Sequence, residues 1–259
     1  MQNSYPSIPK LYLAEIKDQN LWIQFDHEKD TNPFSRKLTV AVTALCEQIE
    51  NDDQIKIVVF TGGMGRSFCA GGDFNDVQKL KEREETKVYL LEIIDLYQAI
   101  LQVTKPTISL IDNYAIGQGL QVALMTDLRI ATHRAQISMP ELKNGVACPL
   151  GATILETYFG RGQMLEDVVG CSMMNAEQSL NKKYFNELCS PEDLFKRGEF
   201  WMKKLSEYPM IPFRITKDIY NKNLFNALEQ VREPAAEAHV QTMLAKSGQA
   251  HFQKILSRG

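Results

Sequence analysis

The sequence has no cysteine pair at the spacing that metal sites or disulfide frameworks need. Its five cysteines form an odd set without a Cys-x-x-Cys pair, and its four histidines are scattered along the chain. Neither a zinc site nor a disulfide framework is indicated, so we expect reduced thiols in the core and no bound metal.

Long apolar runs and an excess of charge of one sign are also missing. No apolar stretch reaches the roughly 18 residues that suggest a membrane span. We recognise no signal peptide in residues 1–24, and the net charge is -3 with both signs interspersed. Nucleic acids and anionic membranes bind clustered Lys and Arg, so we expect neither as a partner. The composition predicts a soluble, cytoplasmic protein.

The glycine motifs of nucleotide-binding proteins are incomplete. Gly117-Gln118-Gly119 begins a dinucleotide fingerprint, but Val122 stands where Gly or Ala is required, and no acidic residue follows the next strand candidate. No glycine loop continues into Gly-Lys-Ser/Thr, which excludes a P-loop. We therefore expect neither a dinucleotide cofactor nor nucleoside triphosphate hydrolysis.

Strand and helix patterns alternate in the first half of the chain, and helical patterns dominate the second. The 259 residues, 44% of them hydrophobic, fit one domain of about 200 residues with an extension. Strands are predicted at residues 21–25, 55–61, 105–111 and near 128–131, and helices at 36–50, 75–101 and 120–127. Later helices are predicted near residues 152–159, 162–169, 176–180, 191–208, 212–223, 224–246 and 251–258.

Two glycine-containing loops each follow an apolar strand candidate. Residues 67–74 read Ser-Phe-Cys-Ala-Gly-Gly-Asp-Phe, and residues 113–119 read Asn-Tyr-Ala-Ile-Gly-Gln-Gly. Glycine lets the backbone approach a ligand closely, and the helix after each loop begins with unpaired N–H groups. Each loop alone is an ordinary strand-to-helix turn. Together they can aim two N–H groups at the oxyanion that develops in acyl chemistry.

Glu141 lies between the two halves of the chain, with Met139, Pro140 and Leu142 as neighbours. Burial beside apolar groups raises the pKa of a carboxyl toward the range useful to a general acid or base. A lone glutamate in a loop is more often solvated. Glu141 becomes a catalytic candidate only because of the protein family that the glycine loops resemble.

Three segments, in this order, resemble the signature segments of the crotonase (enoyl-CoA hydratase/isomerase) superfamily. They are Ser-Phe-Cys-Ala-Gly-Gly-Asp at 67–73, Tyr-Ala-Ile-Gly-Gln-Gly at 114–119 and Met-Pro-Glu-Leu at 139–142, and the similarity covers nearly the whole chain. The resemblance implies an α/β fold, with a crotonase-like ββα spiral core at residues 1–195 and a helical C-terminal trimerisation region at 196–259. It also implies a CoA thioester as the substrate, with no separate cofactor.

The same resemblance assigns roles to residues. The backbone N–H groups of Gly72 and Gln118 would hold an enolate oxygen, and Glu141, Gln121 and His239 would line the pocket as catalytic residues. Its implied substrate-binding residues are Arg36, Ala70, Asp73, Tyr89, Phe252 and Lys254, the last two beside a neighbouring subunit's CoA. His239 lies in a long helical stretch, where a core or interface histidine is the alternative.

Within the superfamily, further segments resemble the carboxymethylproline synthases, which decarboxylate malonyl-CoA and add the enolate to pyrroline-5-carboxylate. These segments are residues 32–36, 71–75, 94–99 and 139–143, with the tail around His239 and residues 248–252. Tyr89 departs from that pattern, which has tryptophan there. The shape of the electrophile's pocket therefore does not follow from the resemblance.

The number of carboxylates bears on the reaction. A typical hydratase uses two, one to activate water and one to deliver a proton, whereas the second position here holds Gln121. An amide exchanges no proton at neutral pH but can orient a carboxylate or a water. One carboxylate suits isomerisation or decarboxylative C–C bond formation, and a single-glutamate hydratase stays open. A thioester-binding protein without turnover and a scaffold subunit also stay open as functions. For Gln121 itself, the alternative is a side chain that is hydrogen-bonded only to nearby backbone.

The C-terminal tail carries apolar residues at helical spacing. They are Leu224, Phe225, Leu228, Val231, Val240, Met243, Leu244, Phe252, Ile255 and Leu256. We expect this surface to be buried between subunits of a homotrimer, or of a hexamer made of two trimers. A tail folded back on its own core in a monomer is the alternative.

Overall fold

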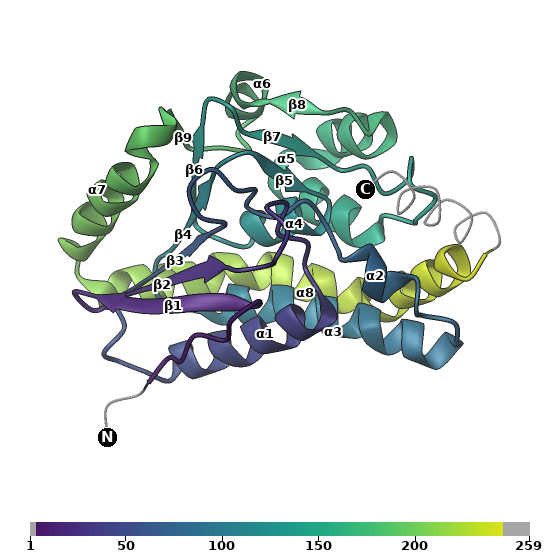
Figure 1. Cartoon of the computed structure of the whole chain (residues 1–259), viewed down its shortest axis with the longest axis horizontal. Coiled ribbons are helices and arrows are strands. Elements are labelled where there is room, and N and C mark those ends of the chain that lie inside the picture. Colours follow the sequence, from purple (N-terminus) through teal and green to yellow (C-terminus); the bar gives the residue numbers. More distant parts are fainter. Residues whose placement is uncertain (1–3, 246–259) are drawn as a thin grey trace.

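The computed structural model describes residues 4–245, and its centre is a six-stranded sheet (Figure 1). The strand order is β1-β2-β3-β4-β6-β9, and all neighbours are parallel except the antiparallel pair β1 and β2. A second sheet has the order β5-β7-β8. The strands are β1 Tyr12–Lys17, β2 Asn20–Phe25, β3 Ile57–Thr61, β4 Thr107–Ile111, β5 Tyr114–Ile116, β6 Leu128–Thr132, β7 Gln136–Ser138, β8 Met174–Asn175 and β9 Glu187–Cys189.

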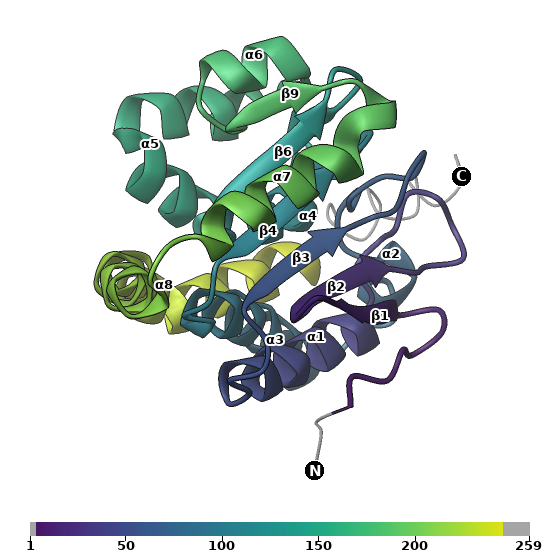
Figure 2. The ribbon, with the colours of Figure 1, turned by 90° about the vertical axis from the view of Figure 1, so that its left-hand side faces the viewer.

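Helices cover both faces of the larger sheet, α1 and α3 on one side and α7 on the other (Figure 2). Along β3, Val58 and Phe60 pack into the core cluster that includes α1 and α3, whereas Ile57 and Val59 pack with α7. Strands covered on both faces are apolar throughout, which is why the sequence revealed them. The helices are α1 Arg36–Glu50, α2 Phe74–Val77, α3 Arg83–Gln102, α4 Gln118–Leu124, α5 Pro149–Gly170, α6 Ala176–Asn181, η1 Pro191–Asp193, α7 Leu194–Ser206 and α8 Met210–Met243.

Several predicted helix boundaries were wrong. The helix expected at residues 75–101 is two, α2 and α3, because Lys79 and Leu80 close tight turns onto the carbonyls of Asp76 and Val77. The helices expected at 212–223 and 224–246 are one, α8, since no turn interrupts them. The break expected between 159 and 162 is present as a kink inside α5 at Gly160, whose φ is 80°.

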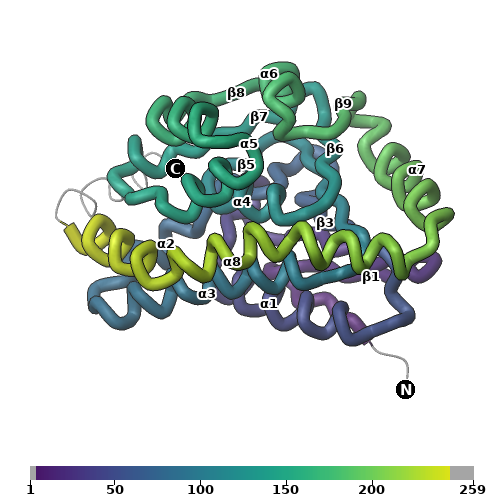
Figure 3. The backbone as a smooth tube through the Cα atoms, turned by 180° about the vertical axis from the view of Figure 1, so that it is seen from behind, coloured from purple at the N-terminus to yellow at the C-terminus, as the bar shows by residue number. Residues whose placement is uncertain are grey.

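The long helix α8 crosses the back of the molecule and packs against α3 and α5 (Figure 3). Its apolar residues Leu224, Leu228 and Met243 are buried in the chain's own core, and Phe225 and Val231 pack partly against it. The expectation that Leu224, Leu228 and Met243 lie between subunits was therefore wrong, because the chain's own core already buries them, and for the partly buried Phe225 and Val231 it stays a prediction. Phe252, Ile255 and Leu256 fall outside the described residues. Within residues 4–245, no helix is both long enough and apolar enough to cross a membrane.

Candidate active site

The two glycine loops are joined to each other by backbone hydrogen bonds. Cys69, in the loop after β3, donates its N–H to the carbonyl of Tyr114 at 3.1 Å and accepts from the N–H of Ile116 at 2.9 Å. Gly119, in the first turn of α4, lies against this contact, because an added Cβ there would be only 2.1 Å from the Cys69 carbonyl oxygen. Because Gly119 has no side chain, the backbone of the second loop can pack directly against that of the first.

The backbone hydrogen bonds on either side of Gly72 direct its own N–H away from the paired segment at Phe34. Phe34 donates to the carbonyl of Gly71 at 2.8 Å and accepts from Asp73 at 2.9 Å, on either side of Gly72. In a parallel bridge, the residue between two such bonds directs its own N–H and C=O to the opposite side. Gly71 has a φ of 108°, a conformation that favours glycine. Gly72 and Gln118 both line one pocket.

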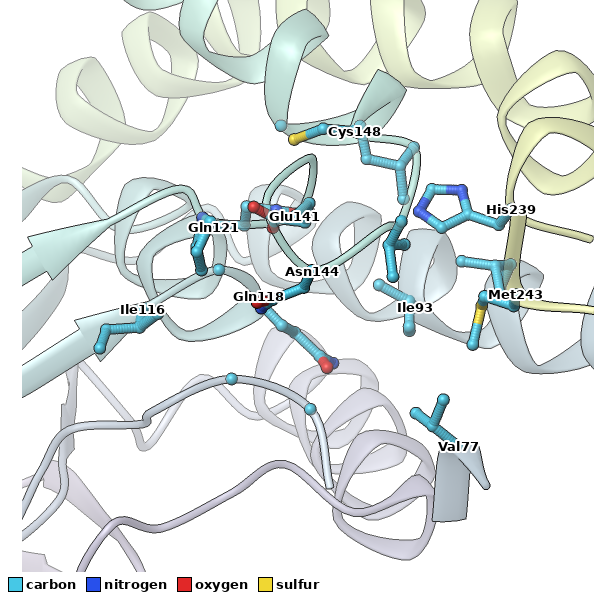
Figure 4. Close-up of a pocket in the computed structure, with 18 of the residues that line it drawn as sticks. Val77, Ile93, Ile116, Gln118, Gln121, Glu141, Asn144, Cys148, His239 and Met243 are labelled. Atoms are coloured by element: carbon cyan, nitrogen blue, oxygen red, sulfur yellow. Dashed lines mark hydrogen bonds between the residues drawn. The ribbon is translucent and has the colours of Figure 1, made fainter. Parts of the chain in front are cut away.

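This pocket has a volume of about 150 Å³ and lies between the two loops, α3, α5 and the end of α8 (Figure 4). A cavity of that order holds a benzene-sized molecule, so its space suits a small acyl group. Most of its wall is apolar, including Val77, Ile93 and Met243. The polar side chains that line it include those of Gln118, Gln121, Glu141, Asn144 and His239.

Among the described residues that line the pocket, Glu141 is the only acidic one. Burial raises its pKa to about 7, which the polar neighbours Cys148 and Gln121 offset only in part. Its Oε2 atom is buried without a hydrogen-bond partner. The carboxyl also lies beside the second loop, since a Cβ added at Gly117 would be 3.1 Å from Glu141 Oε1. A carboxyl with a pKa near 7 can act as an acid or a base at neutral pH.

A chain of hydrogen bonds sets the orientation of the Gln121 side chain. Tyr97 donates its hydroxyl proton to Gln121 Oε1 at 2.8 Å, and Gln121 Nε2 donates to Glu141 Oε1 at 2.8 Å. Because the Tyr97 hydroxyl occupies the amide oxygen, the amide NH₂ faces the carboxylate. Such a donor favours the charged form of Glu141.

His239 is buried at the pocket and uses one ring nitrogen within its own helix. Its Nδ1 lies 2.8 Å from the carbonyl oxygen of Ala235, which can only accept, so Nδ1 carries the proton. Burial lowers the pKa of His239, and this favours the neutral ring. Its Nε2 is then a hydrogen-bond acceptor available to a ligand.

Comparison with known proteins agrees with this geometry. The family described as enoyl-CoA hydratase/isomerase matches residues 15–256. The chain belongs to the enoyl-CoA hydratase/isomerase family. It is 37% identical to carboxymethylproline synthase of Pectobacterium carotovorum subsp. carotovorum, over 96% of this chain and 99% of that protein. The predicted family is thereby confirmed.

Solved structures confirm the predicted crotonase fold. ThnE from S. clavuligerus has a TM-score of 0.73 and 28% identity, over 87% of this chain and 98% of that one. Human mitochondrial delta3-delta2-enoyl-CoA isomerase has a TM-score of 0.87 at 20% identity, over 96% of this chain and 97% of that one. An enoyl-CoA hydratase/isomerase family member with this pocket is an enzyme that acts on CoA thioesters.

The structure of this family member brings most predicted site residues together. Gly72, Gln118, Gln121, Glu141 and His239 all line the pocket, as do Ala70 and Tyr89. The role of each residue in catalysis stays a prediction.

Two other predicted residues, Arg36 and Asp73, do not line the pocket, and two more are not described. Arg36 is not among the described lining residues; its guanidinium holds Glu92 at 2.6 and 2.8 Å. Asp73 is not among them either, and its carboxylate caps α2 by accepting from the N–H of Asn75. Phe252 and Lys254 fall outside the described residues.

Sequence reasoning missed two polar neighbours of Glu141. Tyr97 was named only within a predicted helix and within the segment 94–99 that carries the resemblance, and Cys148 only as a core thiol. Cys148 lies at the start of α5, and its thiol pKa is raised well above the usual range by burial and by Glu141. No motif links them to Glu141, because their contacts join segments far apart in the sequence.

Proposed function

We propose that this enzyme has carboxymethylproline synthase activity, in which malonyl-CoA is decarboxylated and its enolate adds to pyrroline-5-carboxylate. The observation that carries this proposal is the pairing of one pocket carboxylate, Glu141, with the amide of Gln121 instead of a second carboxylate. The 37% identity to carboxymethylproline synthase supports the same reading.

The proposed reaction makes limited demands on protein side chains. The bond between the α-carbon and the carboxylate of malonyl-CoA breaks, CO₂ leaves, and the electron pair becomes an enolate. The N–H groups of Gly72 and Gln118 stabilise the negative oxygen, an interaction that strengthens as charge develops. The enolate carbon then attacks the C=N carbon, whose nitrogen gains a proton. Glu141, with a pKa of about 7, can provide that proton or hold a water that does.

Enoyl-CoA isomerisation is the second candidate. It requires one group that removes a proton from one carbon and returns it to another, and Glu141 has a suitable pKa of about 7 for both steps. Hydration is less well served, because Gln121 cannot exchange a proton.

One set of incubations separates these reactions. The full-length protein is mixed with malonyl-CoA, with and without pyrroline-5-carboxylate, and separately with crotonyl-CoA and a 3-enoyl-CoA, and products are read by mass spectrometry. Carboxymethylproline or its CoA thioester supports the proposal, together with acetyl-CoA when the electrophile is omitted. Inert malonyl-CoA, with rapid hydration or isomerisation of the other thioesters, would overturn it. No turnover of any of them would indicate a binding or scaffold protein.

We also propose that the enzyme is a homotrimer, alone or paired into a hexamer. On α8, Ile211, Ile215 and Ile219 recur every fourth residue and are 74%, 58% and 63% exposed. A contiguous exposed apolar stripe marks a surface that a partner covers. Sedimentation equilibrium at micromolar concentration should give at least three times the 29.5 kDa chain mass. A single species at the mass of one chain would exclude the trimer.

A further inference from the structure

The Gln118 side chain lines the pocket and carries a buried donor that has no partner among residues 4–245. Gln118 is only 8% exposed, and its side-chain Nε2 is buried without any hydrogen bond. Figure 4 shows this side chain pointing from the start of α4 toward the loop that carries Gly72. An unpaired buried donor costs about 1–3 kcal/mol, so a buried amide with this geometry is expected to meet an acceptor on a ligand.

The Tyr89 hydroxyl lies near the other atom of the same amide group, the Gln118 side-chain oxygen. A Cβ added at Gly72 would be 3.2 Å from Gln118 Oε1 and 3.3 Å from Tyr89 Oη. Tyr89 is 4% exposed and lines the pocket, and burial raises its pKa, so the phenol keeps its proton and can donate it. Glycine at position 72 keeps the space between these groups and the oxyanion-binding N–H open.

The geometry points to a carboxylate subsite in which the Gln118 side-chain amide and the Tyr89 hydroxyl hold the carboxylate that malonyl-CoA loses. This inference rests on the proposed function. A carboxylate fits because it has several lone pairs and no donor, and the unpaired NH₂ group of the Gln118 amide and the Tyr89 hydroxyl can both donate to it. The described lining residues include no lysine or arginine, so the group would be held by neutral donors alone.

Neutral donors suit a group that must lose its charge. An arginine or lysine would stabilise the carboxylate strongly before reaction and so raise the barrier to its departure. Two neutral donors fix its direction with a weaker hold. As the C–C bond breaks, the negative charge moves to the thioester oxygen. The N–H groups of Gly72 and Gln118 donate hydrogen bonds to that oxygen and stabilise the charge. Gln118 would thus act twice, with its side chain before bond breaking and with its backbone afterwards.

Equilibrium binding to the Glu141→Gln protein, in which turnover is expected to be slow, tests the subsite. The affinities for malonyl-CoA and acetyl-CoA, which differ by the carboxylate, are measured by titration calorimetry. Gln118→Met removes the amide at nearly the same length, and Tyr89→Phe removes only the hydroxyl. Each should lower the ratio of the two affinities about tenfold, as expected for a hydrogen bond to a charged group. Ile93→Val, which trims the same pocket without a polar change, should leave the ratio unchanged.

The outcomes separate this inference from the proposed reaction. No preference for malonyl-CoA, or a ratio that neither Gln118→Met nor Tyr89→Phe changes, overturns the subsite even if malonyl-CoA is decarboxylated. A ratio that falls as expected in a protein that makes no carboxymethylproline supports the subsite and overturns the reaction. L-Proline, titrated into protein saturated with acetyl-CoA, reports on the electrophile's carboxylate. If Gln118→Met weakens proline and leaves the ratio intact, the assignment to malonyl-CoA is wrong.

Discussion

At the Glu141 end of the pocket, polar side chains are linked to one another by hydrogen bonds. At the Gly72 end, where Gln118 and Tyr89 lie, no such chain of hydrogen bonds is seen among the described residues. Tyr97, Gln121 and Glu141 form a continuous chain of hydrogen bonds, with the Cys148 thiol beside it. At the other end, the amide nitrogen of Gln118 is buried and has no hydrogen-bond partner in the described part of the chain. We therefore expect the first end to hold a proton through contacts within the protein, and the second end to be completed by hydrogen bonds to a substrate.

Because the two ends differ in this way, we expect mutations at each end to have different effects on catalysis. Changes at the Glu141 end should alter rate and pH dependence, because they change how a proton is held. Changes at the glycine loops should weaken the stabilisation of an oxyanion and leave the pH dependence alone. The four predictions that follow test this separation.

Glu141→Gln should have the largest effect, a loss of about 10²–10⁴-fold in turnover, the usual contribution of a positioned acid or base. The measurement is single-turnover kinetics on the identified substrate. Because burial raises the pKa of Glu141 from 4.5 to about 7 in the folded protein, the folded state loses stability as the pH rises from about 4.5 to about 7 and does not regain it above that. The variant should therefore be at least as stable as the parent at pH 8.

Glu199→Gln is the matched control, since Glu199 is exposed on α7. It should leave turnover unchanged. Wild-type turnover by the Glu141 variant would remove this residue from the mechanism.

Gly119→Ala should cost about 10²–10³-fold in turnover, the range seen when one oxyanion donor is lost. The new Cβ would lie 2.1 Å from the Cys69 carbonyl oxygen, a backbone atom, so the two loops must separate. The midpoint of the pH–rate profile should not move. The measurement is kcat/KM across the pH range.

Gly162→Ala controls for the methyl group itself, because nothing lies within 4 Å of a Cβ there. It should retain both rate and stability. If Gly119→Ala keeps full activity, the close approach of the loops is not required to form the site.

Parts of the fold followed from the sequence because burial on both faces makes a strand continuously apolar. β3 and β4 were predicted on this basis, and β2 and β6 were also found. β1 was missed because its residues are mostly exposed, with Glu15 and Lys17 among them. β5, β7, β8 and β9 have two or three residues each, too few to show a period of two.

The residues of the site also differ in how far the sequence alone could indicate them. Gly72, Gln118 and Glu141 lie in the short segments that carry the family resemblance, and the structure places all three at one pocket. Tyr97 lies on the buried face of α3, where it reads like any core aromatic. Its contact with Gln121 joins residues 24 positions apart, and only the packing of α3 against the loops creates it.

Gln121→Glu should raise the hydration of crotonyl-CoA about tenfold, because it supplies the second carboxylate that a typical hydratase uses. The new carboxyl would lie where an amide now donates to Glu141 at 2.8 Å, so the two groups would share a proton. Product formation is followed by the loss of the enoyl absorbance. Rapid hydration by the parent, or no gain in the variant, would show that the missing carboxylate is not what limits hydration.

Tyr97→Phe should have the smallest effect, an upward shift of the pH–rate midpoint by about 0.5–1 unit, corresponding to one hydrogen bond of about 1 kcal/mol. Without the Tyr97 hydroxyl, Gln121 is free to turn its oxygen toward Glu141. A facing oxygen disfavours the carboxylate, so the pKa of Glu141 rises further above about 7. The Tyr208→Phe control, at an exposed tyrosine, should leave the midpoint unchanged. A lower rate for Tyr97→Phe with an unmoved midpoint would mean that Tyr97 only fills space in the core, and that Gln121 keeps its orientation without help.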